Sequence, residues 1–345
     1  MIAIFTQSSS DITVRHLAQI LHERGAAHVI LDPAVIEGKS SLLIEKEPSG
    51  IRCSLRLPDL AIDLSEIRSA WLWRSWQRYE DEPALRDLAA KPREWAFYKG
   101  EWASFCKGLM LTLAYQGVFC VNPPPFNIAF EEKCCQLFLA AKVGLDIPPT
   151  LYTTRPSLAR EFHEVVGDSI IYKPFRTYAH VIEATAGQPI RTSILYTRRV
   201  NPDDLVESAD DIPTPSIFQP YIEKAYELRV VVVGRRLYAC AIHSQQSEIS
   251  REDWRRYDLD NTPYVPHELP EDVAEKLRAL MDALGLVFGS VDMIVTPEGK
   301  YVFLEINPNG QFDWVAKRAG LPIYEALADL LITGGRPAPG DRVAP

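Results

Sequence analysis

Three oxygen-bearing side chains, Asp292, Glu305 and Asn307, carry the strongest chemical signal in the sequence. They lie in residues 291–308, VDMIVTPEGKYVFLEINP, a pattern typical of a β-hairpin. Alternate residues of a strand point to the same face, so Glu305 and Asn307 share one face. A two-residue turn at positions 298–299 would place Asp292 directly opposite Glu305.

Two carboxylates that face each other destabilise a sheet unless a cation lies between them. A hard divalent ion takes carboxylate and amide oxygens as ligands, and Mg²⁺ in particular is usually shared with substrate phosphates. The hairpin therefore predicts a magnesium site. Two alternatives stay open. A turn with a bulge at Gly299 would shift the register and put the carboxylates on opposite faces, and a metal-free hairpin with a solvated polar face is common.

Two lysines are candidates for binding phosphate. Lys173 ends an apolar strand at residues 170–173, where a lysine can reach phosphates as a point charge or can simply extend its ammonium into solvent. Lys133 lies near the start of a helix predicted over residues 128–143, and on its own it is typical of a surface lysine. Neither residue lies in a P-loop pattern, and no GxGxxG opens a helix, so both of these phosphate-binding motifs are excluded.

Arg229 is the third candidate cation. It stands near the start of an apolar strand predicted over residues 228–233, where a guanidinium is costly unless it meets an anion. The anion could be a phosphate, or a carboxylate of Glu223 or Glu227. A polar stretch further on, DWRR at 253–256, offers two arginines that could hold a carboxylate or phosphate, although a tryptophan beside an arginine is also an ordinary surface pair.

Alternating strand and helix patterns must position these side chains. The chain opens with an apolar strand at residues 2–5, a helix spaced as Val14, Leu17 and Leu21, and a second strand at 28–31, which indicates an α/β unit. Pro-rich breaks at residues 121–125 and 211–215 indicate domain boundaries. Further elements are predicted as strands at 71–76, 217–222 and 237–243 and as helices from 93, at 271–284 and at 314–331, the helix from 93 carrying a wide aromatic stripe that fits core packing.

The serial order of these residues resembles the ATP-grasp superfamily. Within it the chain resembles the microviridin-type graspetide synthetases, which are ATP-grasp maturases of ribosomal peptides. The similarity covers roughly residues 70–330. The motifs that carry it are WLWR at 71–74, NPP at 122–124, KCCQLFLAAKVGLDIPPT at 133–150, YKPF at 172–175, QPYIE at 219–223, ELRVVVVG at 227–234, DWR at 253–255 and LEINPNGQF at 304–312.

The resemblance implies an α/β (α+β) ATP-grasp fold with the nucleotide between the last two of three domains. The boundaries that we expect are an N-terminal pre-ATP-grasp domain at 1–120, a central domain at 121–215, a C-terminal domain at 216–335 and a tail at 336–345. Many ATP-grasp enzymes have a glycine-rich flap after the second lysine, whereas residues 176–192 contain only Gly187.

The resemblance also implies a role for each site residue. Lys133 and Lys173 contact phosphates, Glu223 binds the ribose hydroxyls, and Arg229 faces the triphosphate. Arg255 orients the γ-phosphate or the acyl phosphate made from the substrate, and Asp253 is our hypothesis for the base that activates a hydroxyl nucleophile. The adenine hinge is formed by Gln219, Pro220, Tyr221 and Ile222, and the Mg²⁺ ligands are Asp292, Glu305 and Asn307.

By the same resemblance, the cofactors are ATP and Mg²⁺, and the substrate is a precursor peptide with leader and core segments. Asp or Glu side chains of the core are phosphorylated and condensed with Ser or Thr hydroxyls or Lys amines, giving ester or amide rings. A homodimer is consistent with the family. The alternatives are a RimK-like ligase that joins a free amino acid such as glutamate to a peptide or protein carboxylate, a non-catalytic nucleotide-binding protein, and a structural α/β protein.

Composition excludes several classes of function. The 345 residues hold 37 Lys and Arg against 46 Asp and Glu, a formal net charge of −9, which gives no overall electrostatic attraction for nucleic acid or anionic membrane. No apolar run could span a bilayer, and the first residues lack the pattern of a secretory signal. The six Cys show no zinc or disulfide spacing. The sequence therefore predicts a cytoplasmic protein with reduced cysteines.

Overall fold

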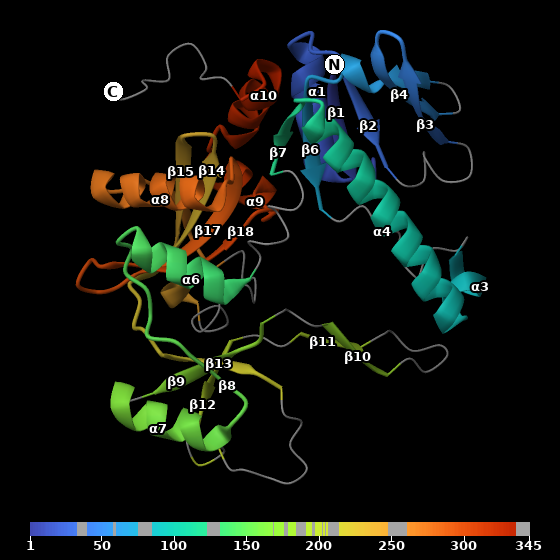
Figure 1. Cartoon of the computed structure of the whole chain (residues 1–345). Helices are drawn as coiled ribbons and strands as arrows, with labels where there is room; N and C mark the ends of the chain where they lie inside the picture. The colour runs from blue at the N-terminus through green and yellow to red at the C-terminus, as the bar shows by residue number, and fades with distance from the viewer. Residues whose placement is uncertain are drawn as a thin grey trace.

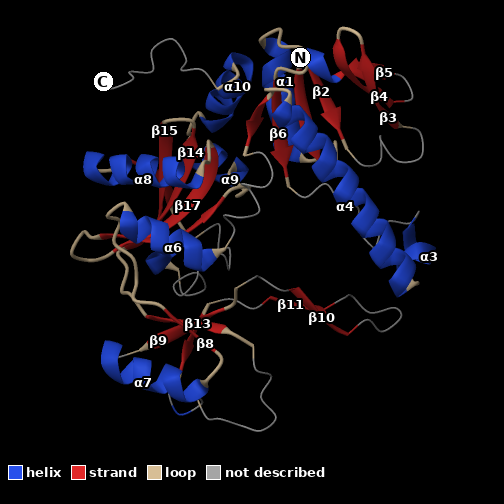
Figure 2. Ribbon diagram, in the orientation of Figure 1, coloured by secondary structure: helices blue, strands red, loops and turns tan. Residues whose placement is uncertain are grey.

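The structure of the chain is a computed structural model in which most residues can be described. The description leaves out residues 33–39, 58–59, 75–84, 123–131, 168, 176–178, 184–190, 195–196, 202, 204, 206–213, 248–260 and 336–345. Three sheet-containing units follow one another along the chain (Figures 1 and 2).

The N-terminal unit is built on a parallel sheet with the strand order β2-β1-β6-β7. Asp11 caps the first helix by accepting hydrogen bonds from the backbone N–H groups of Thr13 and Val14. The predicted opening strand, helix and second strand are confirmed. The elements of the unit are β1 (Ile2–Thr6), α1 (Ile12–Glu23), β2 (His28–Leu31), β3 (Ser41–Glu47), β4 (Gly50–Leu57), β5 (Leu60–Asp63), η1 (Leu64–Glu66), β6 (Ser69–Trp73), α3 (Arg86–Ala89), α4 (Pro92–Tyr115) and β7 (Phe119–Val121).

The central unit holds a smaller sheet with the order β12-β9-β13-β8. Its last strand, β13, pairs with β9 and β8, so hydrogen bonding puts residues 216–220 in the central sheet, beyond the boundary expected at 215. The elements are β8 (Leu151–Thr153), α7 (Pro156–Val166), β9 (Ile170–Lys173), β10 (Ala179–Glu183), β11 (Arg191–Ile194), β12 (Arg198–Val200) and β13 (Ser216–Pro220). Strands β10 and β11 form a separate hairpin that extends from this sheet (Figure 1).

The C-terminal unit is an antiparallel sheet with the order β16-β15-β14-β17-β18. Helix α6 (Lys133–Lys142) packs against β18 and α8, although it precedes the central sheet in the sequence (Figure 1). The other elements are β14 (Tyr226–Val233), β15 (Arg236–Ile242), η4 (Ser244–Gln246), β16 (Tyr264–His267), α8 (Glu271–Leu284), β17 (Phe288–Val295), β18 (Tyr301–Asn307), α9 (Asp313–Ala319) and α10 (Ile323–Thr333). The helix predicted at 271–284 matches α8.

The single helix predicted over residues 314–331 is wrong, because two helices cover this segment. Gly320 ends α9 in the left-handed conformation, with φ of 62°, and Pro322 precedes α10. The apolar spacing continues across the break, since both helices bury residues in one core. The periodicity therefore concealed a Gly and Pro stop signal.

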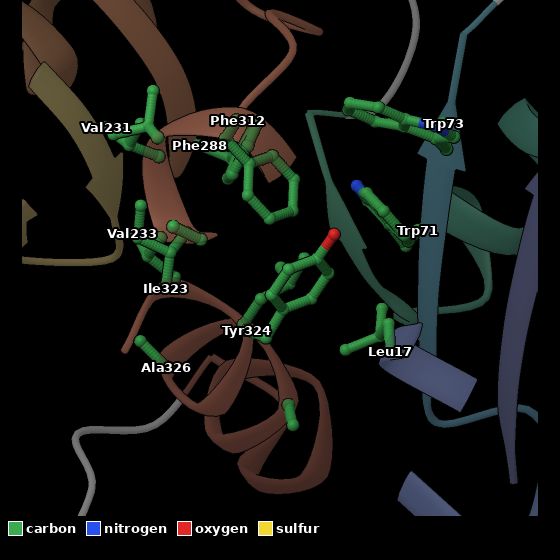
Figure 3. Close-up of a cluster of buried hydrophobic side chains, with 14 of the residues drawn as sticks. Leu17, Trp71, Trp73, Val231, Val233, Phe288, Phe312, Ile323, Tyr324 and Ala326 are labelled. Atoms are coloured by element: carbon green, nitrogen blue, oxygen red, sulfur yellow. The ribbon is translucent and has the colours of Figure 1, made fainter. Parts of the chain in front are cut away.

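The two faces of the C-terminal sheet have different partners. One face packs on α6 and α8 through residues such as Val230 and Met293. The other face is apolar at the end nearest the N-terminal unit, where Val231 and Val233 join a core shared with α1, α10 and Trp71 (Figure 3). The remaining half of that second face carries the predicted site residues. The shared core thus fixes one end of the sheet and leaves the other end for polar side chains.

The described helices include none that combines the length and apolar character needed to cross a membrane.

Candidate active site

A polar row crosses the C-terminal sheet on its second face. Arg229 on β14 pairs with Asp292 on β17, and Asp292 pairs in turn with Glu305 on β18. Ser290 pairs with Asn307 in the next row. The predicted opposition of Asp292 and Glu305 is therefore confirmed, and the strand register brings a guanidinium and two carboxylates into one line.

The hairpin reaches this register by a different route from the predicted two-residue turn. The backbone N–H of Thr296 donates to Lys300 O at 3.0 Å, so the loop holds three residues, with Gly299 at a φ of 81°. That loop alone would put the carboxylates on opposite faces. A β-bulge between the Met293–Phe303 and Asp292–Glu305 pairs then shifts the register back by one residue.

Asp292 is neutralised by a buried guanidinium. Arg229 Nη1 donates to Asp292 Oδ1 at 2.8 Å, with side-chain exposures of 7% and 11%. Arg229 Nη2 donates to the carbonyl of Gln311 at 3.1 Å, so the loop after β18 folds back over the arginine. Gly310 lies in that loop, and a Cβ there would come 2.8 Å from Arg229 Nη2. The buried anion observed beside this arginine is thus the carboxylate of Asp292, which is not one of the three anions that the sequence left open.

Lys133 approaches the same row from the first turn of α6. Its Nζ lies 3.2 Å from Glu305 Oε2 and donates to the carbonyl of Pro174 at 3.2 Å. Pro174 directly follows Lys173, the last residue of β9 in the central sheet. Lys133 therefore connects the two sheets. The predicted helix start at residue 128 lies outside the described residues, and α6 begins at Lys133.

A pocket lies between the central and C-terminal sheets. Its walls come from β9, β12 and β13 on one side and from β14, β17 and β18 on the other, with Lys133 at the start of α6. Eight of the predicted site residues line it, namely Lys133, Lys173, Gln219, Pro220, Tyr221, Ile222, Asp292 and Glu305. Arg229 contacts the pocket indirectly, through Asp292. The exposed side chains of Glu223 and Asn307 are not part of the pocket wall.

Sequence reasoning missed Lys224 and the arginines of β12. Lys224 Nζ donates to Glu227 Oε1 at 2.5 Å, and both side chains are buried while lining the pocket. Arg199 stacks on the ring of Tyr221, with its Cζ 3.7 Å from the ring centroid, and Arg198 stands beside it in the wall. A Lys and a Glu three residues apart give no sequence signal for burial, whereas the two successive arginines, Arg198 and Arg199, are visible in the sequence.

The pocket is cationic within an acidic chain. Five Lys or Arg side chains line it, against the carboxylates of Glu227, Asp292 and Glu305. This excess of positive charge suits a polyanion such as a nucleotide triphosphate. The apolar walls, including Ile171, Ile294 and Leu304, suit a planar base.

The donor set at the sheet row fits Mg²⁺. Asp292 and Glu305 face each other and Asn307 follows on the same strand, which gives carboxylate and amide oxygens. Within the described part of the chain, no group of three or more His, Cys, Asp and Glu is placed to hold a metal. Two carboxylates and an amide suit an ion that takes its remaining ligands from water and substrate phosphates.

Two of the predicted catalytic residues, Asp253 and Arg255, lie outside the described residues. The motif NPP at 122–124 is described only at Asn122, which has a φ of 50° and is buried. Its side chain donates to the carbonyls of Phe288 and Pro308 at 2.7 and 2.8 Å. It also accepts from the N–H groups of Val287 and Phe288. Asn122, directly after β7, thus binds the start of β17 and the residue that follows β18.

Comparisons with known proteins point to one superfamily. The chain superposes on a RiPP-associated ATP-grasp ligase from Chryseobacterium gregarium, in complex with ADP and a leader and core peptide, with a TM-score of 0.83 and 27% identity over 96% of both chains. Macrocyclase MdnB from Microcystis aeruginosa MRC gives a TM-score of 0.70 and 27% identity, covering 96% of this chain and 98% of that one. A probable alpha-L-glutamate ligase from Xanthomonas euvesicatoria is 23% identical over 96% of each chain. No family model matches.

Proposed function

The chain is an enzyme of the ATP-grasp superfamily, and from this premise we propose that it is an ATP-dependent peptide macrocyclase. Its substrate in this proposal is a precursor peptide whose Asp or Glu side chains become joined to Ser or Thr hydroxyls or to Lys amines. One observation supports the nucleotide half of the proposal above all others. Two facing carboxylates, Asp292 and Glu305, line a pocket that is otherwise rich in cations.

The first step activates a carboxylate, which is a poor acyl donor because its oxide leaves badly. A substrate carboxylate oxygen attacks the γ-phosphorus of ATP, the bond to the β-phosphate oxygen breaks, and ADP leaves. In this step Lys133 and Lys173 bind phosphate oxygens, and the segment 219–222 with Arg199 holds the base. Asp292, Glu305 and Asn307 would hold a Mg²⁺ ion, which would supply charge neutralisation. Arg229 orients Asp292 for this task through their 2.8 Å hydrogen bond.

The second step closes the ring. A hydroxyl oxygen or amine nitrogen of the same peptide attacks the acyl phosphate carbon, phosphate leaves, and the nucleophile loses its proton to a base. We propose Asp253 as that base and Arg255 as the cation that orients the acyl phosphate. Proximity within one peptide favours this capture over hydrolysis.

Support for a peptide substrate comes from the solved relatives. The Chryseobacterium ligase is described with a leader and a core peptide, and MdnB is described as a macrocyclase. Both share 27% of their residues with this chain over nearly its full length. Glu223 stays a proposed ribose ligand, with Lys224 as the neighbour that faces the pocket.

The deciding experiment is intact-mass spectrometry of a candidate precursor, encoded next to the gene, after incubation with the protein, Mg²⁺ and ATP. Loss of one water for each ring, dependent on ATP and abolished by Glu305→Gln, is the expected result. The macrocyclase proposal would be contradicted if every precursor tested kept its mass while the protein hydrolysed ATP or used it on another substrate.

A second candidate function rests on the curated relatives, which are described as probable alpha-L-glutamate ligases. A ligase that adds an amino acid would use the same nucleotide residues, because both reactions begin with an acyl phosphate. The same mass measurement separates the two. A ligase gives a mass gain equal to the added residue, and ring formation gives only the loss of water.

A further inference from the structure

We propose that Gln136 is a positioning residue that locks the bulged register of β18 and thereby turns Glu305 toward the pocket, with Asn307 on the same face of the strand. This inference rests on the proposed function for its consequence, and on hydrogen-bond geometry for its cause. Gln136 lies on α6, three residues after Lys133, and it is 1% exposed.

β18 is the last strand of its sheet, so its outer edge presents backbone groups that no further strand pairs. Three of these groups, on Phe303 and Ile306, find partners outside the sheet. The N–H of Phe303 donates to the carbonyl of Asp146 at 2.8 Å. The N–H of Ile306 donates to Gln136 Oε1 at 2.9 Å, and Gln136 Nε2 donates to the carbonyl of Ile306 at 2.7 Å. The Gln136 amide thus makes the two backbone hydrogen bonds to Ile306 that a neighbouring strand would otherwise make.

The bulge is visible in the spacing of the residues whose N–H groups point away from β17, Phe303 and Ile306. In a regular strand the outward-facing residues recur every second position, so Phe303 would be followed by Glu305. The structure instead has Phe303 followed by Ile306, because one residue is inserted between them. Phe303 and Ile306 both enter the core under α6 and α8. Gln136 can form both of its bonds to residue 306 only when the extra residue is present.

Without the bulge, the register of the pairs next to the loop, from Val295–Tyr301 to Met293–Phe303, would continue along the strand. Asp292 would then pair with Leu304, and Glu305 would point into the apolar core under α6 and α8. A buried amide that is satisfied in one register and orphaned in the other selects between them, since an unpaired buried polar group is costly. Gln136 therefore specifies the face on which the proposed Mg²⁺ ligands lie.

Helix α6 also couples this register to the pocket. Lys133 and Gln136 lie about one turn apart on the same helix face and bind successive residues of β18, Glu305 and Ile306. A displacement of the strand end would break both contacts together. Removal of the groups around a metal ligand commonly weakens metal affinity by about 10- to 100-fold.

The test uses Gln136→Met, which keeps the shape of the side chain and removes both hydrogen bonds. We expect the Mg²⁺ concentration that half-saturates nucleotide binding, measured by calorimetry with a non-hydrolysable ATP analogue, to rise about tenfold or more. Ser69→Ala is the matched control, because it removes a buried hydrogen bond, to the carbonyl of Leu331, far from the pocket. The control should lose stability and keep the wild-type Mg²⁺ dependence.

A second measurement needs no variant and no substrate. Residue-resolved hydrogen exchange of the wild-type chain should show that the backbone amide of Ile306 is as strongly protected as the amides of the central strands, although it lies on the outer edge of β18. Rapid exchange at Ile306, or an unchanged Mg²⁺ dependence in a folded Gln136→Met protein, would overturn the proposal. Failure of ring formation with normal Ile306 protection would count against the proposed function alone.

Discussion

Asp292 lies directly opposite Glu305 on neighbouring antiparallel strands, yet each carboxylate is paired with a different cation. Asp292 is held by Arg229 within the protein, and Glu305 is held by Lys133 at the pocket. The side chains of the first pair are 7% and 11% exposed, and those of the second are 22% and 28% exposed. The two pairs therefore differ in how much of the fold depends on them.

This difference predicts unequal costs for two isosteric substitutions. Asp292→Asn leaves a buried guanidinium uncompensated and should lower the free energy of unfolding by about 3 kcal/mol. Glu305→Gln removes a partly solvated pair and should cost about 1 kcal/mol or less. Both should abolish turnover. Urea unfolding of wild type, Asp292→Asn and Glu305→Gln checks the prediction. Equal losses of stability in the two variants would show that the two ion pairs contribute equally despite their different burial.

The loop after β18 leads to a second prediction. A Cβ on Gly310 would lie 2.5 Å from Ser290 Cβ and 2.8 Å from Arg229 Nη2. Gly310→Ala should therefore displace the loop or the arginine, with a stability loss of about 1–3 kcal/mol and a fall in nucleotide affinity.

Gly108→Ala is the matched control. Gly108 lies inside α4 with nothing near its Cβ position, so alanine there should raise stability by about 0.5–1 kcal/mol. Thermal melting and nucleotide titration of both variants provide the comparison. A Gly310→Ala protein with wild-type stability and affinity would show that the loop does not hold Arg229.

Much of the site could be predicted because strand alternation and residue order survive folding. The shared face of Glu305 and Asn307 follows from a period of two, and Lys173 follows from its place at the end of an apolar strand. The loop type could not be predicted, because Gly299 suits a two-residue and a three-residue loop equally well. The bulge could not be predicted either. The side chain that binds the backbone of Ile306 beside it is Gln136 on α6, which lies far away in sequence.

The burial of Lys224 and Glu227 has no local signal in the sequence. The two residues resemble a surface pair, yet their side chains are buried beside the pocket. The break at Gly320 was visible in the sequence, but the apolar spacing on both sides of it favoured one long helix. Tertiary packing therefore decides the details that one-dimensional patterns leave open.

His267 predicts a dependence of stability on pH. Its Nε2 lies 2.9 Å from Tyr301 Oη, and burial, with the nearby His243, holds its pKa below the usual value despite the attraction of Glu268. The unfolded chain therefore binds a proton more readily than the folded one. Stability contributed by neutral His267 is complete above about pH 6.5 and is lost as the pH falls below that value.

Urea midpoints measured at pH 7.5 and pH 5.5 test this prediction. The wild-type chain should lose stability on acidification, and His267→Gln should lose less. His22→Gln provides the control, because His22 is exposed at the end of α1. An identical pH response in wild type and His267→Gln would exclude the role of this ring.

The cysteines give a last prediction, which tests the fold without any substrate. Cys134 is exposed on α6, whereas Cys106, Cys120 and Cys240 are buried. Burial raises the thiol pKa to about 12 for Cys106 and Cys240 and to about 11 for Cys120. Since the thiolate is the reactive form, these three should resist alkylation at pH 8 while Cys134 reacts.

Peptide mapping after brief treatment with iodoacetamide measures the order of reaction. We expect Cys134 to be modified first, and Cys106, Cys120 and Cys240 to be modified only after unfolding in urea, where burial no longer suppresses the thiolate. The two states of one protein thus serve as their own control. Early modification of Cys240 would mean that the antiparallel sheet opens readily, because this thiol lies in the core between the C-terminal sheet and the N-terminal unit.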